Sequence, residues 1–113
     1  SLRASSSAAP DLLTTFAKDM GVLIKLLRNP AEQPDEERFR RIRLENPAIA
    51  RVLKHAGVRE VLEACGFADG SSAEHLELGA VDAHADALLR RAIVKVEAVL
   101  HMLQELHWLY SAH

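Results

Sequence analysis

The sequence predicts an α+β fold that is mostly helical, in which helices cover one small sheet. Apolar residues recur at three- and four-residue spacing over two long segments, residues 10–29 and 82–109, as in amphipathic helices. Two short segments, residues 42–44 and 75–78, instead alternate apolar and polar residues, as strands with one buried face do. Strands this far apart pair only within one sheet, so we expect a single domain over residues 10–113.

Length and composition fit one ordinary domain. The 113 residues are 49% hydrophobic and carry a net charge of −2, so a packed core is expected. The one cysteine, Cys65, excludes an intrachain disulfide and is expected to be buried, in a reducing compartment. No apolar run is long enough to span a membrane. The chain starts at Ser1 rather than Met, so we expect a piece of a longer protein.

The first third predicts one helix and a loop. Residues 1–9 are small and polar and are expected to form a flexible lead-in, with the helix following Pro10. Asn29 should end it, because the residue before Pro30 avoids the helical region. A polar loop follows, with one helical turn expected at residues 35–38. The apolar stripe of this helix comprises Leu13, Phe16, Met20, Leu23, Ile24 and Leu27.

Helix starts and stops are clearer in the rest of the chain. Asn46 followed by Pro47 predicts a helix start, with asparagine as N-cap and proline at the first helical position. Gly57 should stop this helix, and Gly66 should end a second short one. A long helix over residues 82–109 closes the chain.

Several segments, in this order, resemble the PUB domain, also called PUG. They are LLRNP at residues 26–30, FRRIRLENPAI at 39–49, GVREVLEACGF at 57–67 and HLEL at 75–78, followed by the long helix. The resemblance implies a helical bundle packed on a small antiparallel sheet, usually of three strands. The third strand would lie near Phe67 and Ala68, where the residues themselves give no signal.

The resemblance also implies a function. PUB domains occur in cytosolic peptide:N-glycanase, in ubiquitin-regulatory X proteins and in a linear-ubiquitin ligase. We therefore expect a protein-interaction module that docks the acidic-aromatic C-terminal tail of the AAA ATPase valosin-containing protein, or a similar peptide. It would link its parent protein to the ubiquitin-proteasome pathway and ER-associated degradation, as a cytoplasmic, or also nuclear, monomer without a cofactor. Whether the parent is itself an enzyme, such as a glycanase, stays open.

A peptide of this kind needs cations for its carboxylates, an apolar slot for its ring and donors for its backbone. The segment from Arg38 to Lys54 holds six basic residues against one acid, Glu45, a net charge of +5. We expect Arg38 and Arg43 to bind carboxylates, because a guanidinium does so in a two-pronged way. The candidate peptide-binding residues are Arg38 and Arg43 as cations, Phe39, Ala48 and Ile49 for the slot, and Asn29 and Asn46 as donors.

Each candidate also has a purely structural interpretation. In this interpretation Asn46 serves only as a helix N-cap, Asn29 only caps the end of the first helix, and the arginines form a solvated strand face. Phe39 is then a core or rim residue. Glu45 beside the groove would repel an acidic tail by about 1 kcal/mol.

Other classes of function fit less well. The basic strand from Arg38 to Arg43 would also suit nucleic acid, but aromatic residues are few and the chain is acidic overall. No nucleophile–base pair, paired carboxylates or glycine-rich phosphate loop is recognisable, so we do not expect catalysis. The six histidines lack metal-ligand spacing, so we expect no zinc site. Trp108 and Tyr110 are either a packing cap or a contact with further chain.

Overall fold

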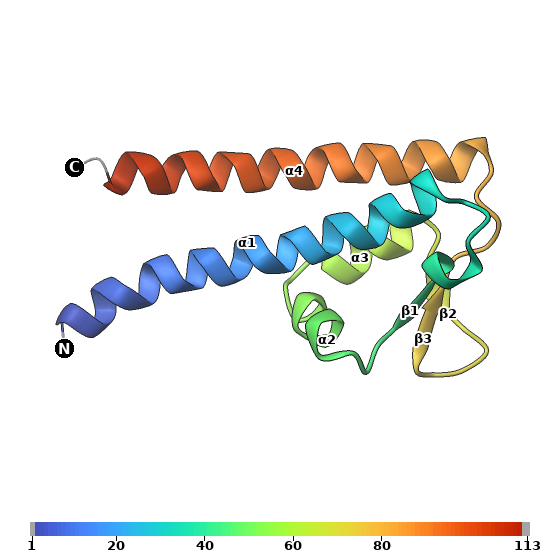
Figure 1. The fold of residues 1–113 in the computed structure, drawn as a ribbon, viewed down its shortest axis with the longest axis horizontal. Coiled ribbons are helices and arrows are strands. Elements are labelled where there is room, and N and C mark those ends of the chain that lie inside the picture. The colour runs from blue at the N-terminus through green and yellow to red at the C-terminus, as the bar shows by residue number, and fades with distance from the viewer. Residues whose placement is uncertain (1, 112–113) are drawn as a thin grey trace.

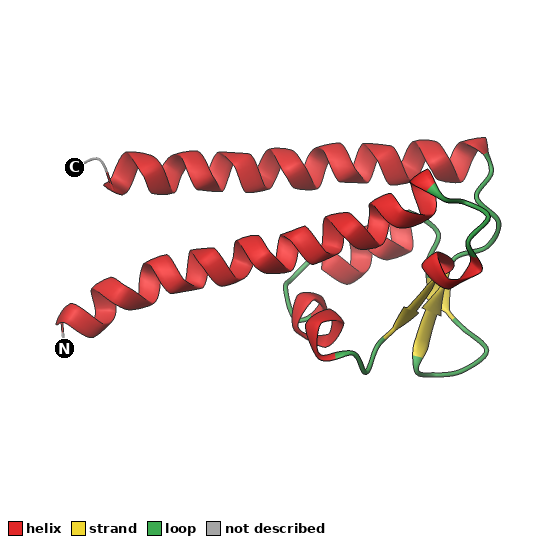
Figure 2. Ribbon diagram, in the orientation of Figure 1, coloured by secondary structure: helices red, strands yellow, loops and turns green. Residues whose placement is uncertain are grey.

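The computed structural model describes residues 2–111, and the side chains of residues 12–111. Its elements in chain order are α1 (Leu2–Glu32), the 3-10 helix η1 (Glu37–Arg40), β1 (Arg41–Arg43), α2 (Pro47–Leu53), α3 (Val58–Ala64), β2 (Ala68–Asp69), β3 (His75–Glu77) and α4 (Ala83–Ser111). The long helices α1 and α4 run antiparallel, and the shorter elements lie along one side of α1 toward its C-terminal end (Figure 1). Figure 2 shows that helix dominates, which confirms the predicted α+β, mostly helical class.

The sheet has three antiparallel strands in the order β1-β3-β2. Ile42 of β1 lies opposite Leu76 of β3, and both side chains are buried. Arg41 and Arg43 flank Ile42 and point to the exposed face, as the alternation of the sequence predicts. β2, at Ala68–Asp69, is the third strand that the resemblance implies.

One apolar core lies between α1, α4, the two short helices and the inner face of the sheet. The buried residues of the predicted stripe on α1 hold this helix against the others, while Leu89 and Ile93 anchor α4. Cys65 is buried in this core, as predicted. The core comprises Met20, Leu23, Ile24, Leu27, Ala31, Ile42, Val52, Val58, Leu62, Cys65, Phe67, Leu76, Leu78, Leu89 and Ile93.

α1 is longer than predicted at its N-terminus. It begins at Leu2, where the sequence led us to expect a flexible lead-in over residues 1–9 and a helix only after Pro10. Residues 2–9 include leucine, arginine and three alanines, which favour helix. The run of serines led to the prediction of a flexible segment. The placement of a domain boundary at residue 10 stays a prediction.

α1 is also longer than predicted at its C-terminus, where it passes Asn29 and ends at Glu32. The Asn29 carbonyl accepts a hydrogen bond from the backbone N–H of Gln33, at 2.9 Å. Pro30 is fully buried, and the guanidinium of Arg90 donates to the carbonyl of Ala31 at 3.3 Å. Tertiary contacts thus outweigh the local preference against helix before proline. The short helical turn also shifts, from the expected residues 35–38 to η1.

The long helices give the molecule its shape. α1 and α4 are 31 and 29 residues long, and the molecule measures 50 by 27 by 19 Å. α4 begins as predicted, because the Asp82 carboxylate accepts from the backbone N–H of Ala85 at 2.8 Å and caps the helix. No helix within residues 2–111 combines the length and apolar character needed to cross a membrane.

Candidate peptide-binding site

Asn46 caps α2 and keeps one functional group free. Its side-chain oxygen accepts hydrogen bonds from the backbone N–H groups of Ala48, at 2.9 Å, and Ile49, at 3.3 Å. Pro47 occupies the first helical position, where its missing N–H costs nothing. The side-chain NH2 of Asn46 donates to no described residue, and the side chain is exposed. Asn46 therefore combines the predicted cap with a donor that remains available to a ligand.

Arg43 lies one tight turn before Asn46. The backbone N–H of Asn46 donates to the Arg43 carbonyl at 3.3 Å, which closes the turn. Arg43 is exposed on an edge strand, and its guanidinium pairs with no acidic side chain in the part of the chain that the structure describes. The local fold thus places a cation and an amide donor, both without partners in the described chain, three residues apart on one turn.

Arg38 and Phe39 form a second cluster on η1. The Arg38 guanidinium carbon lies 4.8 Å from the centroid of the Phe39 ring, a cation–π arrangement. Arg38 also pairs with Glu36 at 3.4 Å, and its side chain remains 75% exposed. Phe39 is half-buried, so one part of its ring remains accessible beside a cation.

The remaining candidates take different positions. Ala48 and Ile49 are half-buried in the first turn of α2, next to Asn46, and Ile49 packs against the core. Asn29 is half-buried in the last turns of α1, so it does not cap the helix end. α1 contacts η1, which brings the C-terminal end of α1 near the Arg38–Phe39 cluster.

Strand β1 separates the candidates into two clusters. Backbone hydrogen bonds from Leu78 to the Arg40 carbonyl, at 2.7 Å, and from Leu44 to the Glu74 carbonyl, at 2.9 Å, lie at the two ends of β1. The three extended residues of this strand span about 10 Å. The structure therefore brings Arg43, Asn46, Ala48 and Ile49 together at one end of β1, and Arg38 and Phe39 together at the other.

Acidic neighbours neutralise much of the basic segment. Arg41 pairs across the sheet with Glu77 at 3.3 Å, and Arg51 pairs with Asp19 at 2.9 Å. Arg40 donates to the carbonyl of Pro34. Among the described residues, Arg43 is thus the one basic residue of the strand whose side chain has neither an acidic nor a carbonyl partner.

Sequence reasoning missed a buried acid, Asp19. Its side chain is 1% exposed, accepts a hydrogen bond from Arg51 Nε, and lies 2.8 Å from His55 Nε2. Burial raises the pKa of this carboxyl, but the hydrogen bonds from His55 and Arg51 outweigh it and hold the pKa below its usual value. Asp19 follows Phe16 by three residues, so its position on the apolar face of α1 was a signal that could have identified it.

The fold is that of a small, mostly helical α+β domain with a three-stranded antiparallel sheet. A family model described as PUB domain matches residues 14–102, which is more than three quarters of the chain. The chain therefore belongs to the PUB domain family, and as such it is a protein-interaction module that binds peptide partners. No curated protein and no solved structure gives a significant match to the chain.

Proposed function

We propose that this domain docks the acidic-aromatic C-terminal tail of the AAA ATPase valosin-containing protein, or a tail of the same chemistry. One observation carries the proposal: Arg43 has no acidic partner among the described residues, and it stands one turn from the free amide NH2 of Asn46. A guanidinium binds a carboxylate through two parallel hydrogen bonds. The amide can then donate to a backbone carbonyl of the bound peptide.

The second cluster suits the aromatic side chain of such a tail. The ring of Phe39 is half-buried beside the cationic Arg38, and aromatic rings pack against one another and against guanidinium groups. The three residues of β1 separate the two clusters, and four or five residues of extended peptide exceed the roughly 10 Å that this strand spans. An extended tail would thus place its carboxylate at Arg43 and its ring at Phe39.

Titration of a fluorescently labelled C-terminal tail peptide of valosin-containing protein tests this proposal. We expect micromolar affinity for the unmodified domain. Arg43→Gln should weaken binding about tenfold or more, because a charge-assisted bidentate pair is lost. Lys25→Gln, which removes an exposed cation on α1, is the matched control and should leave the affinity unchanged. Equal affinities for Arg43→Gln and the unmodified domain would contradict the assignment of this site.

The proposed pathway follows from the proposed partner. A domain that binds this ATPase would connect its parent protein to the ubiquitin-proteasome pathway and to ER-associated degradation, in the cytoplasm or also the nucleus.

The alternative function, binding of nucleic acid, has fewer cations available for phosphate groups, since Arg41 and Arg51 pair within the chain. Binding to single-stranded RNA that falls steeply with salt, without binding to the tail peptide, would favour that alternative.

A further inference from the structure

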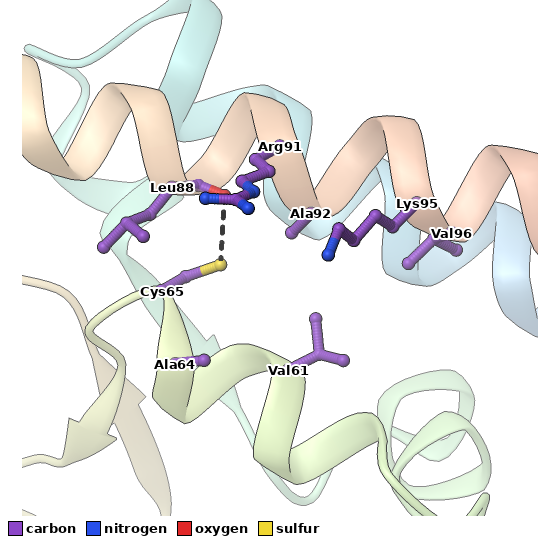
Figure 3. A pocket seen from close by; sticks show the side chains of 8 residues that line it. All are labelled: Val61, Ala64, Cys65, Leu88, Arg91, Ala92, Lys95 and Val96. Atoms are coloured by element: carbon purple, nitrogen blue, oxygen red, sulfur yellow. Dashed lines mark hydrogen bonds between the residues drawn. The ribbon is translucent and has the colours of Figure 1, made fainter.

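An apolar hollow of about 300 Å³ lies between α3 and α4, on elements that the proposed peptide site does not use. Val61 and Ala64 form its α3 wall, and Leu88, Ala92 and Val96 form its α4 wall. Figure 3 shows Val61 and Lys95 directed into the space between the two helices. Cys65 is buried, and its thiol donates to the Leu88 carbonyl at 3.7 Å, which closes the hollow at this end.

A second apolar hollow continues the first. It has a volume of about 280 Å³, shares Val61, Lys95 and Val96 with the first, and extends to Phe16 on α1 and Val99 on α4. The combined groove follows α4 from Leu88 to Val99, and these positions lie about 16 Å apart along a helix. This is the length of three helical turns, and the groove is open to solvent along its side.

Two cations without partners border this groove. Arg91 and Lys95 are exposed, stand one turn apart on α4, and form no ion pair or hydrogen bond with any residue whose side chain is described. Like charges at this spacing destabilise a helix. The acidic residues of α4 are engaged elsewhere, Asp86 with Arg90, Glu97 with Arg28 and Glu105 with His101. A carboxylate of a bound partner would therefore reduce the repulsion between Arg91 and Lys95, which no acidic residue of α4 offsets.

We infer that this groove is a second docking site, which binds an acidic amphipathic helix of a partner protein. The apolar face of such a helix fills the groove between α3 and α4, and its carboxylates pair with Arg91 and Lys95. An open groove leaves the other face of the bound helix in water, as an amphipathic helix requires, whereas a lipid chain requires enclosure on all sides. The site is independent of Arg43 and Asn46, so the domain can hold two partners.

Selection of a displayed library of random 16-residue peptides against the domain tests the inference. We expect enriched peptides to carry aliphatic and acidic residues at helical spacing. Their binding should fall at least tenfold in the double variant Arg91→Glu/Lys95→Glu, which preserves the like-charge pair and reverses only its sign. Ala64→Trp, at an exposed position on the groove wall, should also weaken binding by obstructing the groove.

Arg43→Gln is the matched control. It should weaken binding of the tail peptide of the proposed function and leave binding of the enriched peptides unchanged. In spectra of the isotope-labelled domain, the amides of Val61, Ala64, Ala92 and Val96 should shift on titration with an enriched peptide. Failure to enrich any peptide, or enriched peptides that bind the charge-reversed variant equally well, overturns the inference. Shifts of these amides with dodecanoate alone and with no enriched peptide would also overturn it, in favour of a lipid ligand.

Discussion

The side chain of Asn46 holds two groups with different tasks. Its oxygen caps α2 through Ala48 and Ile49, while its NH2 remains free. Asn46→Asp retains a capping oxygen at a helix N-terminus, where negative charge is favourable. We expect this variant to have an unchanged free energy of unfolding and an affinity for the tail peptide at least tenfold lower. Asn46→Ala should lose binding and also about 1 kcal/mol of stability.

Urea unfolding and peptide titration of the same samples separate these effects. Asn46→Ser, which caps without adding charge, controls for repulsion between a new carboxylate and the acidic tail. Undiminished binding by both Asn46→Ser and Asn46→Asp would show that the amide has no part in recognition.

The buried carboxylate of Asp19 connects α1 to α2 through an ion pair with Arg51, whose side chain is partly exposed. Replacing its carboxylate by an amide in Asp19→Asn removes charge-assisted hydrogen bonds to Arg51 and His55, so we expect a loss of about 2 kcal/mol at pH 7. Because the folded-state pKa is lowered, the stabilisation is fully present above the unfolded-state pKa of about 3.9. It disappears as the pH falls through the lower folded-state pKa.

Unfolding free energies measured by urea between pH 7 and pH 2 check this expectation. The unmodified domain should lose stability below about pH 4, and Asp19→Asn should show a smaller loss over the same interval. Asp35→Asn, at an exposed position, is the control and should follow the unmodified domain. An acid dependence of equal size in Asp19→Asn would contradict the role assigned to this carboxyl.

Three glycines, two at the ends of α3 and one inside α1, should respond differently to replacement by alanine. Gly57, with φ of 88°, begins α3, and Gly66, with φ of 110°, follows it. Gly57→Ala meets no atom within 4 Å, so it should lose only the 1–2 kcal/mol of the left-handed conformation. Gly66→Ala should lose more, because its Cβ would also lie 3.1 Å from Leu78 Cδ1. Gly21→Ala, in open space inside α1, should instead gain about 0.5–1 kcal/mol.

Thermal and urea unfolding of the three alanine variants give the order of stability directly. Gly21→Ala should exceed the unmodified domain, which should exceed Gly57→Ala and then Gly66→Ala. Equal stability of Gly57→Ala and the unmodified domain would show that the left-handed conformation is not required at the start of α3.

The elements that the sequence predicts well are those with local chemical signals. Asn46-Pro47 starts α2 and Gly66 follows α3 as predicted, through capping and positive φ. Gly57 also marks a boundary, but as the N-cap of α3 and not as the predicted stop of α2, which already ends at Leu53. β2 has no such signal, because both of its residues are exposed and it exists through pairing with β3. The C-terminal end of α1 differs from its predicted position for the same reason, because the burial of Pro30 is a tertiary effect.

In the candidate site, too, the features with local signals are predicted well and those that depend on tertiary contacts are not. The turn from Arg43 to Asn46 is local, and the sequence suffices to place these residues together. The partners that neutralise Arg41 and Arg51 come from β3 and α1, at sequence separations that no local pattern encodes. The net charge of +5 in the basic segment can be counted from the sequence, but only the fold shows that Arg41 is paired on β1 and that Arg43 has no acidic partner among the described residues.

The whole molecule is more elongated than its length requires. Its radius of gyration is 16.1 Å, whereas a compact domain of this length would have roughly 13 Å. The described side chains of residues 104–111 on α4 are all exposed, so this end of the helix extends past the core. Trp108 and Tyr110, 67% and 82% exposed, do not cap it.

Small-angle X-ray scattering tests this shape and the expected monomeric state together. A monomer with α1 and α4 extended as in Figure 1 should give a radius of gyration near 16 Å and the mass of one 12.5 kDa chain. A value near 13 Å at the same mass would mean that the long helices fold back onto the core in solution. A doubled mass at micromolar concentration would mean that the exposed apolar residues of α4, such as Met102 and Leu106, pair two copies instead.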